Sequence, residues 1–423
     1  MKKIYLAFLY AIGGLTLQSC LHDDKEFFED SAANRIESTV ENTKSLLESA
    51  ENGWELHYFT GEQYSGGGYT FLLKFQNGKV TVGGDAAIAT STERVTSSYD
   101  VNRSMGPVLT FNTYNSILHA LGTPDYNNIQ GEQGDWEFVV TKLTQDSIYV
   151  RGKKWGNNMV FTRVPQTVDW KEHLDSIADV QGKLKVNYTA GGSDDVSKLI
   201  ELNNTSRRIA YRNDLGQLEE YPYVITSKGV QTLAPVHVGN SDAQDFEVAQ
   251  DGHLLMKGKE QQELVPYVTS IDTWIGEWSM AAMVGSCDIT ISQSEEKADS
   301  LIGVFKVDSI SYQIGLTYDA TTGNLHLGCQ DIKDPSFHYA GIWFINADLS
   351  KGSLLGQGGM NIVWHGVSQE AGFEDDGTLA SDGYHSDTFV GVALDASGQL
   401  MQDDKGFIFP ITWYYVSSLT PNK

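Results

Sequence analysis

Hydrophobic and polar residues alternate in short runs along most of the chain. Trp54–Phe59 shows the pattern, with Trp54, Leu56 and Tyr58 at every second position. Such alternation is typical of strands that bury one face in an antiparallel sheet. Turn signals separate the runs, and the Asn77-Gly78 pair predicts a tight hairpin. The expected fold class is all-β, built from antiparallel barrel or sandwich domains with a few short helices.

Two segments depart from the alternation. Apolar residues recur near the helical period over residues 31–50, and Asn52-Gly53 supplies a stop after them. Residues 167–179 repeat this pattern, with the larger apolar side chains on one face. Both segments are predicted to be helices.

The chain is expected to divide into a leader, a tether and two folded regions. The C-terminal region opens with Gly276-Glu277-Trp278, a pattern similar to the start of small up-and-down barrels, in which the tryptophan packs across the barrel floor. The expected divisions are a signal peptide over 1–19, an acidic tether over 20–30, a helix-plus-β region over 31–271 with a break near 165, and a barrel-like domain over 272–423.

The N-terminus has the pattern of a secretory signal. Lys2 and Lys3 precede a short, mainly apolar stretch, and Ser19 precedes Cys20. A cysteine after a small residue, with Leu17 three positions before it, resembles the lipobox of bacterial lipoproteins. We therefore expect cleavage before Cys20 and a membrane anchor through lipid on its thiol. An ordinary signal peptide with an incidental cysteine is the alternative.

The residues after Cys20 are acidic, with Asp23, Asp24, Glu26, Glu29 and Asp30. Such a stretch resembles the export tag of surface lipoproteins, and it equally suits a solvated tether. The expected location is the outer membrane, on the cell surface, with its periplasmic face as the alternative.

Net charge narrows the range of partners. The chain carries a net charge of −25, which repels phosphate backbones, so nucleic acid is not an expected partner. Neutral or cationic ligands are favoured. Of the three cysteines, Cys287 and Cys329 share the C-terminal region, where they could pair outside the cytoplasm or lie as small buried hydrophobic residues.

No catalytic signature is present. The sequence has no His-Glu-x-x-His, no Gly-x-Ser-x-Gly, no P-loop and no Cys-x-x-Cys. Its histidines are scattered rather than spaced as metal ligands on one helix. No catalytic residue, metal or cofactor is expected.

Aromatic residues suggest binding instead. Trp364-His365 and Asp382-Gly383-Tyr384 combine aromatic, polar and glycine residues in segments that break strand alternation. Sugar faces stack on such rings, while amides and carboxylates bind the hydroxyls. We expect Trp364, His365, Asp382 and Tyr384 to be surface residues that bind a ligand such as a saccharide. Core packing is the alternative.

Several glycine- and aromatic-rich stretches occur over the first part of the chain. They are Asn52-Gly53-Trp54, Gly67-Gly68-Tyr69, the stretch from Gly106 to Asn115 with His119, Gly134-Asp135-Trp136-Glu137-Phe138, and Gly152-Lys153-Lys154. With these stretches, this part of the chain resembles a Bacteroidota lipoprotein family known as domain of unknown function 4302. The resemblance implies a cell-surface or periplasmic lipoprotein encoded near glycan- or nutrient-import systems, and it assigns no reaction.

The most specific of these stretches has two interpretations. Asn112, Tyr114, Asn115 and His119 could bind a ligand, or they could fix a corner through buried hydrogen bonds. Two functions follow for the whole chain. One is a ligand-binding lipoprotein that serves an import system, and the other is a structural subunit of an import complex with no small ligand. A secreted hydrolase is a third and weaker hypothesis.

Overall fold

The computed structural model describes residues 32–422, apart from 87–88, 105, 125–130, 239–240, 258–261, 283–284, 308–309, 333–338, 347–352, 383, 387, 402–409 and 415. The signal peptide, the acidic tether and Cys20 lie outside the described residues. Among the residues that are described, no helix is both long and apolar enough to cross a membrane.

The first folded unit is a closed barrel of eight antiparallel strands, called barrel 1 here. Every second residue of β1 faces inward, so Trp54, Leu56 and Tyr58 are buried in the barrel core. Helix α2 (Ala32–Glu48) packs Val40 and Leu47 against that core. The strands are β1 (Trp54–Phe59), β2 (Gly68–Gln76), β3 (Lys79–Gly84), β4 (Val95–Arg103), β5 (Pro107–Phe111), β6 (Glu137–Leu143), β7 (Ser147–Gly152) and β8 (Asn158–Arg163).

Helix α4 (Trp170–Lys183) connects barrel 1 to a second closed eight-stranded barrel, called barrel 2. The side chain of Asp169 accepts a hydrogen bond from Glu172 N and so caps the helix. The strands of barrel 2 are β9 (Asn187–Ala190), β10 (Ile200–Asn203), β11 (Arg208–Arg212), β12 (Leu218–Ile225), β13 (Gly229–Val238), β14 (Ser241–Val248), β15 (Leu254–Met256) and β16 (Glu263–Pro266).

The C-terminal domain contains a third closed barrel, barrel 3, and a separate five-stranded sheet. Trp278 is buried at the start of this barrel and stacks on Trp274, with ring centroids 5.6 Å apart. The strands of barrel 3 are β17 (Gly276–Ala282), β18 (Gly285–Gln293), β19 (Ser300–Val307), β20 (Ile310–Tyr318), β21 (Leu325–Gly328), β25 (Gly359–His365), β26 (Glu370–Asp375) and β29 (Val416–Pro421). The separate sheet comprises β22 (Gln330–Ile332), β23 (Tyr339–Asn346), β24 (Ser353–Leu355), β27 (Thr388–Leu394) and β28 (Pro410–Tyr414).

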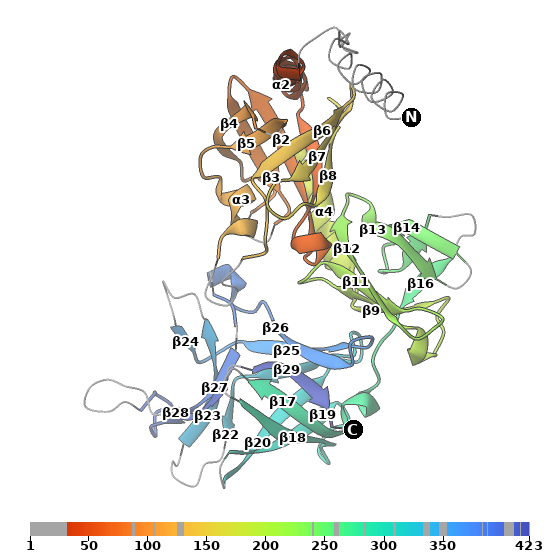
Figure 1. The fold of residues 1–423 in the computed structure, drawn as a ribbon. Coiled ribbons are helices and arrows are strands. Elements are labelled where there is room, and N and C mark those ends of the chain that lie inside the picture. Colours follow the sequence, from red (N-terminus) through yellow and green to blue (C-terminus); the bar gives the residue numbers. More distant parts are fainter. Residues whose placement is uncertain are drawn as a thin grey trace, which may run out of the picture.

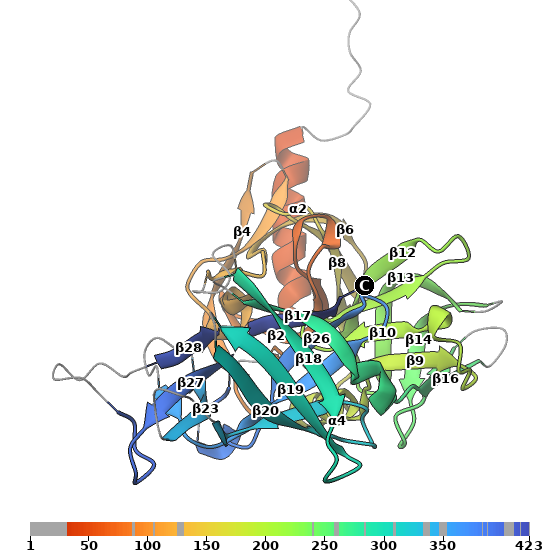
Figure 2. The same ribbon diagram turned by 90° about the horizontal axis from the view of Figure 1, so that it is seen from below.

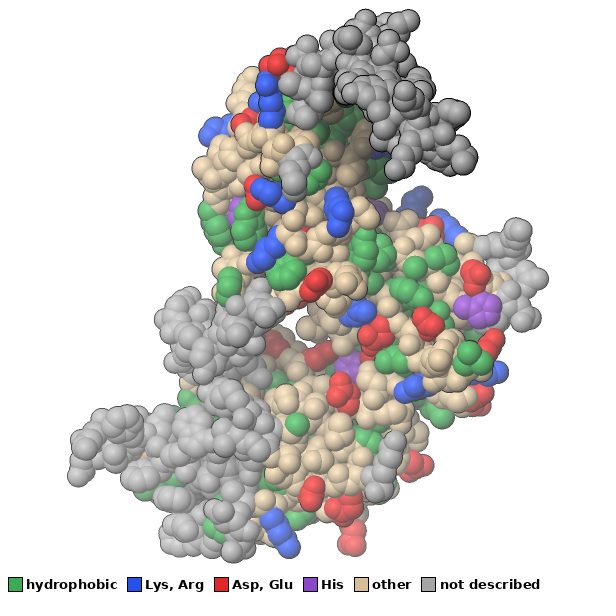
Figure 3. All heavy atoms as spheres, viewed as in Figure 1, with side chains coloured by type: hydrophobic (Ala, Val, Ile, Leu, Met, Phe, Trp, Pro, Cys, Tyr) green, Lys and Arg blue, Asp and Glu red, His purple; other side chains and the backbone are tan. Residues whose placement is uncertain are grey.

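Figure 1 shows the two N-terminal barrels and the C-terminal domain as three distinct bodies, and Figure 2 shows the C-terminal domain from below, in front of barrel 1. Helix α2 lies at the end of barrel 1 farther from the C-terminal domain (Figure 1). The space-filling view in Figure 3 shows the molecule hollowed between barrel 1 and the C-terminal domain.

The predicted fold class is confirmed, because the strands pair antiparallel and form barrels with few short helices. The two predicted helices correspond to α2 and α4. The region expected over 31–271 contains two barrels, and residue 165 lies between the first barrel and α4. The Asn77-Gly78 hairpin is present, and both residues have positive φ, as such a tight turn requires.

Buried polar contacts join barrel 1 to barrel 2. Arg207 forms a buried ion pair with Asp85, and its guanidinium lies 4.9 Å from the ring centroid of Tyr69. Thr70 Oγ1 donates a 2.9 Å hydrogen bond to the carbonyl oxygen of Ile225. Gly68 lies so close to the backbone of barrel 2 that an added Cβ would sit 2.4 Å from the Tyr223 oxygen. The two barrels are therefore held in one fixed arrangement.

Candidate functional site

The residues predicted from the sequence to bind ligand do not form one surface. Trp364 lies on β25 with 7% of its surface exposed, and its ring packs edge-on against Trp274 and Trp278. The expected surface position of Trp364 is therefore wrong. The Trp364 side chain faces the core, as do those of Met360 and Ile362, so the inward-facing positions of β25 continue through Trp364. The nearby glycines obscured this alternation in the sequence.

His365 is also buried, at the joint between barrel 3 and barrel 2. Its Nδ1 lies 2.9 Å from Oε1 of Glu201 on β10. The other Glu201 oxygen accepts hydrogen bonds from the backbone N–H groups of Val367 and Ser368, at 3.1 and 3.2 Å. Asn187 completes the joint by donating to the Trp364 oxygen and accepting from Gly366 N. The surface position expected of His365 is thus also wrong, because its ring forms part of a contact between domains.

The Glu201 carboxylate and the His365 imidazole stabilise each other's charged form. Burial raises the free energy of the ionised Glu201 carboxyl, but its contacts with His365 and Ser368 outweigh this effect and lower its pKa. Burial likewise disfavours the charged imidazole of His365, while Glu201 favours it more strongly, so the His365 pKa is raised. The result is a buried ion pair that fixes the C-terminal domain on barrel 2.

The remaining candidates in the C-terminal domain are separate from this joint. Asp382 is exposed in a short turn, and Tyr384 is half-buried against the core of barrel 3. Cys287 and Cys329 are separate thiols, so the structure contains no disulfide between them. Burial raises the pKa of the Cys329 thiol to about 11. Among the described residues, no group of three or more His, Cys, Asp or Glu side chains is placed to hold a metal ion.

The long connection between β5 and β6 carries the best-defined exposed site. Asn115 begins helix α3 (Ser116–His119), and its buried side-chain oxygen accepts from the N–H groups of Ile117 and Leu118. Its side-chain nitrogen donates to the Val95 oxygen, which ties the corner to β4. Asn115 is therefore a structural residue, as one of the two interpretations of this stretch proposed.

Three aromatic rings lie together beside that corner, and we call Tyr114, His119 and Trp136 the aromatic platform. The His119 ring stacks on Trp136, with centroids 5.6 Å apart and planes 22° from parallel. The Tyr114 ring also contacts His119, with centroids 5.3 Å apart and planes 41° from parallel. Tyr114 is 64% exposed and Trp136 is 38% exposed. Figure 3 shows hydrophobic and histidine side chains together over α3 on the visible face of barrel 1.

The Trp136 side of the platform is fixed by the residues around it. The carboxylate of Asp135 accepts from the backbone N–H groups of Lys154 and Trp155, at 2.7 and 3.2 Å. Tyr58 OH donates to the Asp135 backbone oxygen from inside the barrel. The Trp136 ring packs so closely on Gly122 that a Cβ there would lie 2.7 Å from it. These contacts bring the Gly134-Asp135-Trp136 and Gly152-Lys153-Lys154 stretches together in the fold.

The platform is uncharged. Burial lowers the pKa of His119, and backbone hydrogen bonds at Asn115 and Phe111 only partly oppose this effect. The neutral ring can accept the Asn115 N–H at Nδ1, which is 3.1 Å away. The site therefore presents two exposed aromatic faces around a neutral imidazole, in a fixed geometry. The sequence pattern indicated Tyr114 and His119 as a possible ligand site, but no local signal brings Trp136 beside them.

The fold and this site define an all-β chain of linked eight-stranded barrels with an exposed aromatic site on the first barrel. The chain belongs to the family described as a domain of unknown function (DUF4302), whose model matches residues 24–250. That match covers barrel 1 and barrel 2 through β14. A comparison with curated proteins finds no match.

Among solved structures, a crystal structure of the vaccine antigen transferrin binding protein B from Haemophilus parasuis Hp5 is similar at 10% sequence identity. The similarity covers 90% of this chain and 72% of that chain, with a TM-score of 0.15. A likeness of this size supports no statement about ligand or partner.

Proposed function

We propose that this protein is a lipoprotein, anchored to the outer membrane through Cys20, that binds a saccharide on the aromatic platform. The observation that carries the proposal is the cluster of three contacting rings, in which Tyr114 is 64% exposed. Large aromatic side chains that remain exposed in a rigid, uncharged arrangement are suited to a ligand with an apolar face and hydroxyl edges. Pyranose rings have both.

Rigidity favours binding on this platform. Asn115 holds α3, Asp135 holds the start of β6, and His119 contacts both exposed rings. Binding therefore immobilises few additional side-chain torsions, and more of the stacking energy contributes to affinity. By analogy with aromatic pairs, each ring contributes on the order of 1 kcal/mol beyond area burial.

The position of the platform suits a membrane tether. Glu48 of α2 accepts from Gly78 N in the β2–β3 turn, so α2 packs at the barrel end that carries this turn. The platform follows β5 and precedes β6, at the opposite end of the barrel. A tether that leads into α2 would leave the platform facing away from the membrane, where an import system would present or receive a glycan.

A glycan array probed with the purified full-length protein in detergent tests the proposal. The wild-type protein should bind at least one saccharide, and Tyr114→Ala should reduce that signal several-fold. Tyr114→Phe keeps the ring and should retain the signal. Leu215→Ala, at an exposed position in barrel 2, is the control for a general loss of surface apolar area. Equal signals for wild type and Tyr114→Ala would reject the platform as the site.

A structural role in an import complex is the second candidate, and one observation favours it. Leu215 is 82% exposed and Leu218 is 48% exposed on the β11–β12 hairpin of barrel 2. Two leucines are far less than the roughly 800 Å² per partner of a standard interface, so this role ranks below saccharide binding. A partner retained by the wild type from solubilised native membranes and lost by Leu215→Ala would reverse that order.

A further inference from the structure

A groove between the two N-terminal barrels is separate from the aromatic platform. It has a volume of about 590 Å³, within the range of small-molecule sites. One wall is the outer face of β1 and β8, the opposite wall is β13 and β14 of barrel 2, and α4 closes one end. The polar residues that line it include Glu55, His57, Asn158, Thr162, His173 and Gln231.

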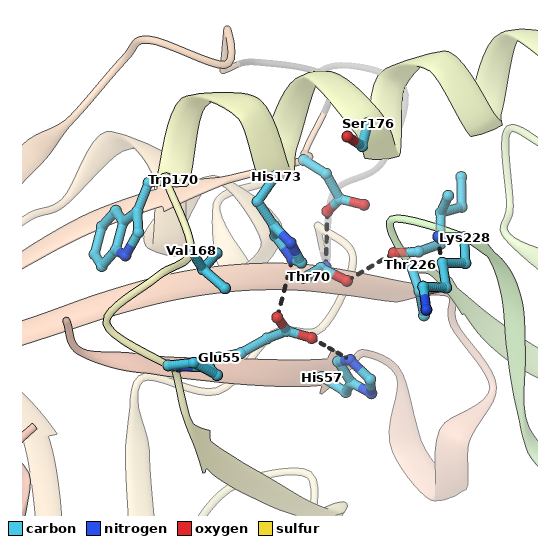
Figure 4. Close-up of polar contacts among 12 residues, drawn as sticks. Glu55, His57, Thr70, Val168, Trp170, His173, Ser176, Thr226 and Lys228 are labelled. Carbon is cyan, nitrogen blue, oxygen red and sulfur yellow. Dashed lines mark hydrogen bonds and ion pairs between the residues drawn. The ribbon is translucent and has the colours of Figure 1, made fainter.

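Glu55 is the charged centre of this groove, and Figure 4 shows it between His57 and His173. Its Oε1 lies 2.9 Å from Nε2 of His57, and its Oε2 lies 3.0 Å from Nε2 of His173. The His173 contact is close but poorly aligned for a hydrogen bond. Burial opposes ionisation of Glu55, yet the two imidazoles outweigh it and lower the pKa to about 2.

The ionised carboxylate determines what the groove offers to a ligand. A carboxylate has more acceptor positions than two imidazoles occupy, so Glu55 can still accept hydrogen bonds from the hydroxyl groups of a ligand. When such an imidazole is neutral and donates Nε2–H toward Glu55, its Nδ1 can accept a hydrogen bond. Apart from Arg163, the other polar lining groups are neutral, namely the hydroxyls of Thr162 and Thr232 and the amides of Asn158, Gln231 and Gln244. The Gln231 amide also donates to Oδ1 of Asp245 at 2.7 Å.

Among the described residues that line the groove, Arg163 is the one Lys or Arg side chain, and it is paired. Its Nε lies 3.4 Å from Oδ1 of Asp146, and its guanidinium donates to the Ser49 hydroxyl and the Gln145 oxygen. The ionised Glu55 carboxylate would repel an anionic ligand. The apolar lining from Val160, Val168 and Leu233 can contact the carbon face of a small ring.

We propose that this groove is a second binding site, for a neutral monosaccharide or disaccharide that binds independently of the aromatic platform. The walls come from both barrels, and the contacts of Arg207 with Asp85 and of Thr70 with Ile225 fix those barrels relative to each other. The groove is thus formed before a ligand enters, which lowers the entropy lost on binding.

Isothermal titration of the purified full-length protein in detergent tests this site. The probes are glucose, galactose, mannose, N-acetylglucosamine, maltose and cellobiose, each titrated separately. Thr162→Val removes one lining hydroxyl at nearly constant volume, and Gln231→Leu removes one lining amide. Each variant should weaken the binding of the saccharide that the wild type binds by about tenfold, as expected for one lost hydrogen bond. Gln217→Leu, at an exposed position on the β11–β12 hairpin, is the matched control and should bind as the wild type does.

The two proposed sites can fail separately. Binding that survives Tyr114→Ala but is weakened by Thr162→Val and Gln231→Leu supports the groove, whatever the array shows for the platform. Absence of saturable heat with all six sugars would overturn the groove proposal, and so would binding that the two groove variants leave unchanged. Binding that is lost in Tyr114→Ala would assign the sugar to the platform instead.

Discussion

Trp364→Ala should strongly destabilise the C-terminal domain. The ring is 7% exposed and packs against Trp274 and Trp278, so its removal leaves a cavity in the core of barrel 3. Truncation of a buried tryptophan to alanine costs about 3–5 kcal/mol. For a domain of roughly 150 residues, this loss lowers the melting temperature by roughly 6–20 °C.

Differential scanning calorimetry is the appropriate assay, because linked domains need not unfold in one transition. Trp364→Phe keeps an aromatic ring in the core and should lose much less stability. Tyr114→Ala is the exposed counterpart and should change stability by about 0.5 kcal/mol or less. If the C-terminal domain of the Trp364→Ala variant has a melting temperature within about 1 °C of that in the Tyr114→Ala variant, the assignment of Trp364 to the core is refuted.

Three further predictions concern the anchor and the domain joint. Cys20→Ala should abolish incorporation of labelled palmitate, and label that persists in this variant would disprove the lipid anchor. Glu201→Gln should leave the buried His365 charge without its partner, at a cost of about 3–5 kcal/mol, and should expose residues 267–275 to limited proteolysis. Docking of the C-terminal domain should also depend on pH. Because the pKa of His365 is raised, the imidazole stabilises docking fully below its ordinary pKa of 6.5, and this stabilisation is lost as pH rises through the raised pKa. Because the pKa of Glu201 is lowered, the carboxylate stabilises docking fully above its ordinary pKa of 4.5, and this stabilisation is lost as pH falls through the lowered pKa. Protection from protease should therefore be greatest near pH 5–6, and a flat profile from pH 4 to 9 would contradict the ion pair.

Local pattern was enough to predict the strands of barrel 1. The alternation in Trp54–Phe59 has one cause, since every second residue faces a core enclosed by neighbouring strands. The end of the second helix was predicted less well. Helix α4 continues to Lys183, about one turn beyond the predicted end at residue 179, because Val180 is still buried on its apolar face.

Contacts between distant residues could not be predicted in this way. Glu201 and His365 are 164 residues apart, and only the docking of barrel 3 on barrel 2 brings them together. In the sequence, His365 therefore resembled a ligand-binding residue, although in the structure it belongs to the joint between barrel 3 and barrel 2. The aromatic platform has the same origin, because His119 and Trp136 meet only after the β5–β6 connection has folded back on barrel 1.

The most direct test of the central claim is the dissociation constant of the full-length protein for the saccharide with the strongest signal on the glycan array, measured by isothermal titration. Trp136→Ala removes one exposed ring of the platform and should raise this constant at least about fivefold, which corresponds to ~1 kcal/mol of stacking. Trp136→Phe should stay close to the wild-type value, because it keeps a ring beside His119. An unchanged dissociation constant in Trp136→Ala would contradict the account and would place the saccharide elsewhere on the protein.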